Sequence, residues 1–171
     1  MVETQEEENV YNWDVMEIGH TATPLTVEVT KERIANYAKS VRDDNPIFFD
    51  EAAAKAAGFD GIVAPPTMLY VYSPMRRAEI MNGLGYVSPE QSKEARSTPF
   101  AGTEVMFQGV PVLAGDTITS QPTVDRKWES SSGNRFVSFR TVATNQRGEK
   151  VVEYLYNVIW EYAQGQKSRN S

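Results

Sequence analysis

The chain has 171 residues, of which 40% are hydrophobic and 23% charged, so we expect one globular domain over residues 1–171 with a sizeable core. The net charge of −6 argues against nucleic acid or an anionic membrane as the main partner. The sequence has no cysteine, which excludes disulfides, a thiol nucleophile and thiolate metal sites and fits a cytoplasmic location.

The first predicted elements follow an acidic N-terminus. Residues 1–10 are polar and lack the apolar core of a signal peptide, so we expect a flexible tail there and another over residues 163–171. No apolar run is long enough to span a bilayer. Residues 24–29 alternate with period two and predict a strand. Thr30 is placed to cap a helix over residues 31–41, whose apolar side chains recur at helical spacing.

A turn and a short helix come next. A residue that precedes proline is pushed out of the helical region, so the preceding helix must end near Asp44, before Pro46. Asp50 is expected to cap an Ala-rich helix, and Gly58 is expected to end it.

Residues 67–81 are apolar on nearly all sides, which is typical of a buried central helix. Pro66 suits its first turn, where a missing N–H costs little. Pro74 interrupts it, and Ser73 could cap a second piece, so we predict a kink or break there. Residues 86–101 indicate a loop.

Four long strand-like runs, separated by turn residues, complete the chain and predict an antiparallel meander. They are Thr103–Val112, Thr117–Glu129, Arg135–Thr144 and Lys150–Tyr162.

The order Asp43-x-Asn45-Pro46-Ile47, an aromatic residue, Asp and an Ala-rich helix resembles the MaoC-like hydratases and dehydratases. The variant Ala64-Pro65-Pro66-Thr67 resembles their FAS1-like dehydratase half, including the non-catalytic subunit of heteromeric (3R)-hydroxyacyl dehydratases. The resemblance covers roughly residues 26–162. It implies an α+β hot-dog fold, in which an antiparallel sheet wraps around a long central helix, and a substrate that is an acyl thioester of CoA or acyl carrier protein.

The resemblance also indicates what this chain lacks. The family pattern continues with a histidine, where this sequence has Phe48, and the central helix of the family begins with His-Gly, where this sequence has Pro65-Pro66. Phe48 cannot titrate, and Pro66 has no N–H to hold an oxyanion. Asp43 and Asn45 remain as catalytic candidates, although Asp43 could equally be a turn or cap residue.

Seven residues are implied in substrate binding; they are Phe48, Ala64, Pro66, Thr67, Tyr70, Phe107 and Val110. For Phe107 and Val110, plain sheet core is an equally good interpretation. Arg76 and Arg77 could meet CoA phosphates or form a solvated face. His20 is the only histidine and lies in the N-terminal segment, so neither a metal site nor a Ser-His-Asp arrangement can be assembled. No cofactor is expected.

Three functional interpretations remain open. The chain could be the acyl-thioester-binding subunit of an (R)-specific enoyl-CoA hydratase or 3-hydroxyacyl dehydratase, with the Asp/His pair supplied by a MaoC-like partner. It could be a self-sufficient homo-oligomeric hydratase that uses Asp43. It could also be a hot-dog acyl-CoA binder without activity, or a thioesterase.

Overall fold

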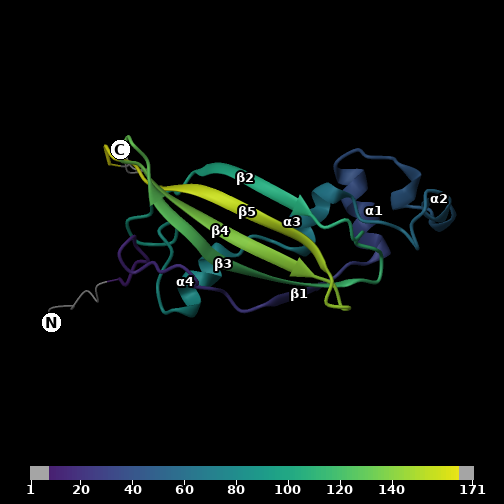
Figure 1. Ribbon diagram of the computed structural model, residues 1–171, viewed down its shortest axis with the longest axis horizontal. Helices are drawn as coiled ribbons and strands as arrows, with labels where there is room; N and C mark the ends of the chain where they lie inside the picture. The colour runs from purple at the N-terminus through teal and green to yellow at the C-terminus, as the bar shows by residue number, and fades with distance from the viewer. Residues whose placement is uncertain (1–7, 166–171) are drawn as a thin grey trace.

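Within residues 8–165, which the computed structural model describes, five strands form one antiparallel sheet in the order β1-β3-β4-β5-β2 (Figure 1). The strands are β1 Leu25–Glu28, β2 Phe100–Phe107, β3 Thr117–Glu129, β4 Arg135–Thr144 and β5 Lys150–Glu161. The predicted bounds of β3 and β4 are confirmed. The strand expected over 103–112 is shifted, because β2 begins at Phe100 and ends at Phe107.

Short helices cover one face of the sheet and one of its ends (Figure 1). They are α1 Lys31–Ser40, the 3-10 turn η1 Pro46–Phe48, α2 Glu51–Ala56, the 3-10 turn η2 Pro66–Met68, α3 Leu69–Tyr72 and α4 Arg77–Gly83. The predicted caps are confirmed: the Thr30 hydroxyl accepts from the Arg33 N–H at 3.1 Å, and Asp50 accepts from the Ala53 N–H at 2.7 Å. Gly58, with φ +91°, follows the end of α2 as predicted.

The expected long central helix is instead a series of short pieces, η2, α3 and α4. The predicted break at Pro74 is confirmed, but Ser73 ends α3 and does not cap α4, which begins at Arg77. The segment is also less buried than its composition indicates. Tyr70 and Val71 are 41% and 44% exposed, because the sheet covers only one side of α3.

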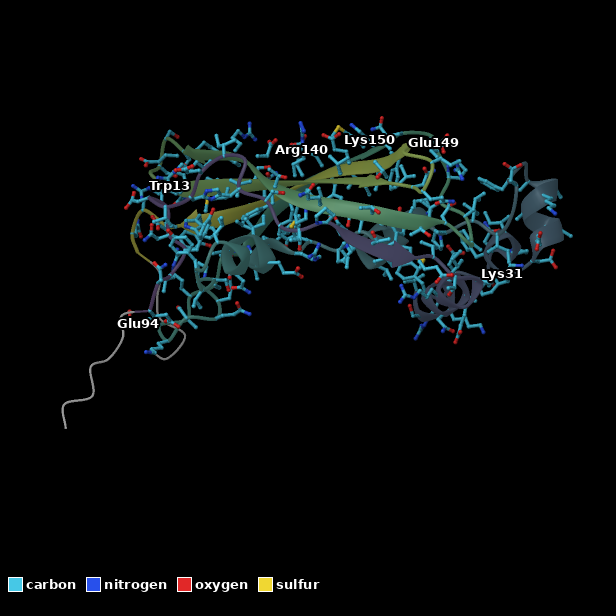
Figure 2. The ribbon with its side chains drawn as sticks, turned by 90° about the horizontal axis from the view of Figure 1, so that it is seen from below. Trp13, Lys31, Glu94, Arg140, Glu149 and Lys150 are labelled. Atoms are coloured by element: carbon cyan, nitrogen blue, oxygen red, sulfur yellow. The ribbon has the colours of Figure 1, made fainter. Side chains whose placement is uncertain are left out.

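In the described part of the chain, buried apolar side chains form two clusters on the helix-covered face of the sheet. One lies under α1 and α3 and includes Leu69, Tyr72 and Tyr154. The other lies under α4 and the N-terminal segment and includes Phe139 and Trp160. In β4, Val137 and Phe139 point into these clusters, whereas Arg140 is exposed. Figure 2 shows Arg140 and Lys150 on the opposite, solvent face.

The N-terminal segment packs along the sheet. Val10 forms a bridge with Val87, and the Lys127 ammonium donates to the main-chain carbonyls of Trp13 and Met16 at 2.9 and 2.8 Å. Residues 8–10, predicted to be part of a tail, are therefore attached to the domain. The rest of the predicted tails, apart from residues 163–165, lies outside the described residues.

Candidate functional site

A cavity of about 350 Å³ opens where η1, α3 and the end of β2 meet. This volume is at the lower end of the range of ligand pockets, about 300–1,000 Å³. Its lining consists of Ile47, Phe48, Phe59, Val63, Ala64, Pro66, Tyr72, Phe107, Gly109, Val110, Pro111, Val112 and Val151.

Main-chain hydrogen bonds hold the cavity walls together. The Ala64 N–H donates to the Val112 carbonyl at 2.8 Å, and the Ala114 N–H donates to the Ile62 carbonyl at the same distance. These bonds tie the link between α2 and η2 to the segment that follows β2. As a result, the start of the central segment and the end of β2 face each other across the cavity.

The lining residues differ strongly in exposure. Phe107 is 51% exposed, and Pro66 is also exposed, so both belong to the rim. Tyr72 is 2% exposed and Val151 is 1% exposed, so both belong to the buried part of the lining. A ligand that enters at the rim would therefore extend toward Tyr72.

Five of the seven residues predicted to bind substrate line this cavity. They are Phe48, Ala64, Pro66, Phe107 and Val110. The other two, Thr67 and Tyr70, are exposed and do not belong to the lining. The Tyr70 hydroxyl instead lies 3.2 Å from the Thr103 hydroxyl on β2, and its ring packs edge-on against Tyr154.

The two catalytic candidates, Asp43 and Asn45, lie outside the cavity lining and are exposed. Their side chains have local structural partners. Asp43 accepts from the Asn45 N–H at 3.2 Å, and Asn45 caps η1 by accepting from the Ile47 N–H at 3.3 Å. The turn interpretation thus describes the contacts that Asp43 makes, and its catalytic role stays a prediction.

The histidine is remote from the cavity. His20 Nδ1 is hydrogen-bonded to the Tyr11 hydroxyl at 2.7 Å, and Tyr11 belongs to the cluster under α4. Burial raises the pKa of Tyr11, so this hydroxyl remains a donor at neutral pH. His20 therefore has a structural partner in the N-terminal segment and cannot reach a ligand held at Phe48.

Arg76 and Arg77 are engaged by acidic side chains. Arg76 pairs with Glu79 and also donates to the Thr23 carbonyl at 2.9 Å. Arg77 pairs with Glu90 at 3.1 Å. Neither residue lines the cavity, so the structure brings no arginine to it.

Over residues 8–165, no cluster of His, Cys, Asp and Glu side chains could hold a metal ion. No helix in that range is long and apolar enough to cross a membrane.

The cavity is apolar in character. Among the lining residues described, only Tyr72 carries a polar side-chain group, and none is charged. Burial raises the pKa of Tyr72, so its hydroxyl is neutral at physiological pH. This chemistry suits an apolar ligand, but it offers no base that could activate water.

Sequence reasoning missed several lining residues, above all Tyr72, Phe59 and Val151. Tyr72 could have been found from the winding of the helix start. A 3-10 turn has three residues per turn, so Pro66 and Leu69 share a face, and Tyr72 follows three residues later on nearly the same face.

Three comparisons place the chain among known proteins. Residues 16–154 match the model of a family described as "FAS1-like, dehydratase domain region". A UPF0336 protein of Streptomyces coelicolor is 30% identical over 140 residues, which are 79% of this chain and 86% of that protein. The alpha subunit of 3-oxo-4,17-pregnadiene-20-carboxyl-CoA hydratase of Mycobacterium tuberculosis is 45% identical over 62 residues, 36% of this chain and 18% of that protein.

Among solved structures, the HadBC complex of Mycobacterium tuberculosis, a (3R)-hydroxyacyl-ACP dehydratase, contains a similar chain. The TM-score is 0.64 and the identity 26%, and the match covers 84% of this chain and 97% of that one. The predicted hot-dog fold is thereby confirmed.

Proposed function

This chain belongs to the family of FAS1-like dehydratase domains, and on that premise we propose that it is an acyl-thioester-binding subunit of an (R)-specific enoyl hydratase or 3-hydroxyacyl dehydratase. The catalytic Asp/His pair would come from a MaoC-like partner. The named relatives that are subunits of a hydratase or dehydratase support this role.

One observation carries the proposal: the cavity is lined by Phe48 and Pro66, which stand where the resembled family has its histidine and its His-Gly pair, yet the described lining has no acid or base. Phe48 occupies the histidine position and faces the cavity, while Asp43 is not in the lining. Hydration requires a base for water and a donor for the thioester oxygen. Pro66, at the start of the central segment, has no N–H to donate. The site therefore retains the means to bind an acyl group and lacks the means to convert it.

The partner would dock along β2, the edge strand of the sheet. β2 pairs with β5 on one side, and no strand of the described chain pairs with its other edge. Large apolar side chains are exposed on β2 and on the neighbouring α3; they are Tyr70, Val71, Phe100, Met106 and Phe107. An unpaired strand edge with exposed apolar residues favours strand addition by another chain. A subunit bound there would also cover the rim at Phe107.

The test is to co-express the chain with a MaoC-like protein that carries an intact Asp-x-Asn-Pro-x-His pattern. We expect the two to co-purify and to hydrate crotonyl-CoA together, whereas the chain alone binds acyl-CoA without turnover. If the isolated chain hydrates crotonyl-CoA at an ordinary rate and Asp43→Asn abolishes the activity, the chain is a self-sufficient hydratase and the proposal is wrong. Hydrolysis of acyl-CoA by the isolated chain would identify a thioesterase instead.

A further inference from the structure

The Tyr72 hydroxyl does not take part in the hydrogen bonds that stabilise the described part of the fold. Within residues 8–165, no other group hydrogen-bonds to it, although the side chain is only 2% exposed. Tyr72 belongs to the buried part of the cavity lining. The Tyr72 oxygen is not among the fully buried side-chain atoms that lack a partner, so it keeps some accessible surface, as expected for a group that faces the cavity.

The other buried tyrosines provide a contrast. The Tyr154 hydroxyl donates to the Ser73 carbonyl at 2.6 Å, and the Tyr11 hydroxyl is bonded to His20 at 2.7 Å. Burial raises the pKa of Tyr154, and its hydrogen bond to Ser73 offsets part of that effect. For Tyr72, burial is the sole cause of the raised pKa. Among the buried tyrosines described, Tyr72 therefore differs in that its hydroxyl has no protein partner and is available to a ligand.

We propose that Tyr72 is the polar anchor of the cavity and that its hydroxyl donates a hydrogen bond to an oxygen carried on the acyl group of the ligand, away from the thioester. This inference rests on the proposed function, because the acyl thioester is what sets the orientation of the ligand. It narrows the substrate class to acyl groups that bear a keto or hydroxyl oxygen on an otherwise apolar body.

The position of Tyr72 indicates how far along the acyl group that oxygen should lie from the thioester. η2 and α3 together place Tyr72 six residues beyond Pro66, which corresponds to about 10 Å of rise at roughly 2.0 Å per residue in the 3-10 turn and 1.5 Å in the α-helix. The thioester would lie at the rim near Pro66. This separation favours an oxygen well along the acyl group, rather than the thioester oxygen, as the partner of the hydroxyl.

The experiment compares matched ligands on the full chain by isothermal titration calorimetry. One pair is octanoyl-CoA with 7-oxooctanoyl-CoA, and a second is decanoyl-CoA with 9-oxodecanoyl-CoA. Pairing a hydroxyl with a neutral acceptor corresponds to about 2- to 10-fold in affinity. We expect the unaltered chain to prefer at least one oxo ligand over its parent by that factor. Tyr72→Phe should abolish this preference by weakening only the oxo ligand.

Tyr154→Phe is the matched control, because it removes a buried hydroxyl from a tyrosine that already has a partner at the end of α3. It should leave the ratio between oxo ligand and parent unchanged, and thermal unfolding of both variants verifies that they are folded. Equal affinity for oxo ligand and parent within both pairs in the unaltered chain, or an equal loss for oxo ligand and parent in Tyr72→Phe, would overturn the proposal.

A ligand without CoA separates this inference from the proposed function. If the acyl-CoAs do not bind but 2-octanone does, and Tyr72→Phe weakens it, the acyl-thioester role fails and the anchor stands. If acyl-CoAs bind with no dependence on Tyr72, the anchor fails and the acyl-thioester role stands. If neither kind of ligand binds, both are wrong.

Discussion

Replacing Phe48 by histidine restores the family's catalytic residue type at its own position, and we predict that it does not restore catalysis. The backbone there should be retained, because the Phe48 N–H donates to the Asn45 carbonyl at 3.1 Å and Asn45 caps η1. The new imidazole would face a lining with no carboxylate to orient it, since Asp43 lies outside the cavity.

The Phe48→His chain should be much less active than a complex with a MaoC-like partner, because it still lacks an oxyanion donor. An oxyanion donor contributes about 10²–10³-fold, and Pro66 cannot supply one. The Phe48→His chain alone should therefore hydrate crotonyl-CoA at no more than about 1% of the rate of the complex with a MaoC-like partner. The isolated unaltered chain provides the baseline.

The same substitution should lower stability, because Phe48 is only 6% exposed. Burying a large apolar side chain contributes about 1.5–3 kcal/mol, and an unpaired imidazole adds a penalty of about 1–3 kcal/mol. A domain of this size loses about 2–4 °C in Tm per kcal/mol, so we expect Tm to fall by about 5–25 °C. Phe48→Leu, which adds no polar group, should lower Tm by less than Phe48→His.

The pH dependence of the variant follows from burial, which disfavours the charged imidazole. Its pKa in the folded state should lie below the unfolded value of about 6.5. The unfolded state then binds more protons, so stability is lost as the pH falls below about 6.5. Urea unfolding at pH 5 and pH 8 measures this difference. Ordinary hydratase rates in the Phe48→His chain alone would refute the reasoning, because Asp43 would then have to reach the cavity.

Four further predictions follow from other parts of the fold. Met106→Lys at the β2 edge should abolish co-purification with the partner, because a lysine on an edge strand opposes strand addition. Lys127→Met removes two charge-assisted bonds to N-terminal carbonyls and should lower Tm by about 5–10 °C. Gly133→Ala should lower stability by about 1 kcal/mol or more, since φ is +81° and the new Cβ would lie 3.1 Å from the Ala163 Cβ. By contrast, Gly83→Ala in α4 should raise stability by about 0.5–1 kcal/mol. Ser120→Ala removes a buried hydroxyl without a partner and should leave urea unfolding unchanged or raise stability by up to about 1 kcal/mol.

Local chemistry explains why much of the fold could be read from the sequence. Thr30 and Asp50 cap helices through bonds to residues three positions ahead, and Pro74 ends α3 because proline excludes a continued helix. The bounds of β3 and β4 follow from alternation between turn residues. Each of these signals acts over a few residues, so no knowledge of the rest of the molecule is needed.

The cavity lining was only partly predictable, because signals that act over a few residues do not show which side chains meet across the fold. Phe48, Pro66 and Phe107 were found because a family motif marks them. In a continuous α-helix Tyr70 would lie about 40° from Pro66, whereas the observed 3-10 start brings Tyr72 to within about 60° of Pro66 and turns Tyr70 to about 100°. A choice between two helical windings depends on what the segment packs against.

The sequence by itself determined the strands apart from the bounds of β2, the helix caps, the break at Pro74 and the absence of a histidine at position 48, all through local geometry or residue type. Only the tertiary structure decided which side chains meet: Asp43 outside the cavity, His20 paired with Tyr11, Arg77 paired with Glu90, and the Tyr72 hydroxyl unpaired in the cavity. Hydrogen bonds and ion pairs between distant residues depend on how sheet and helices pack, and no spacing along the chain encodes that packing directly.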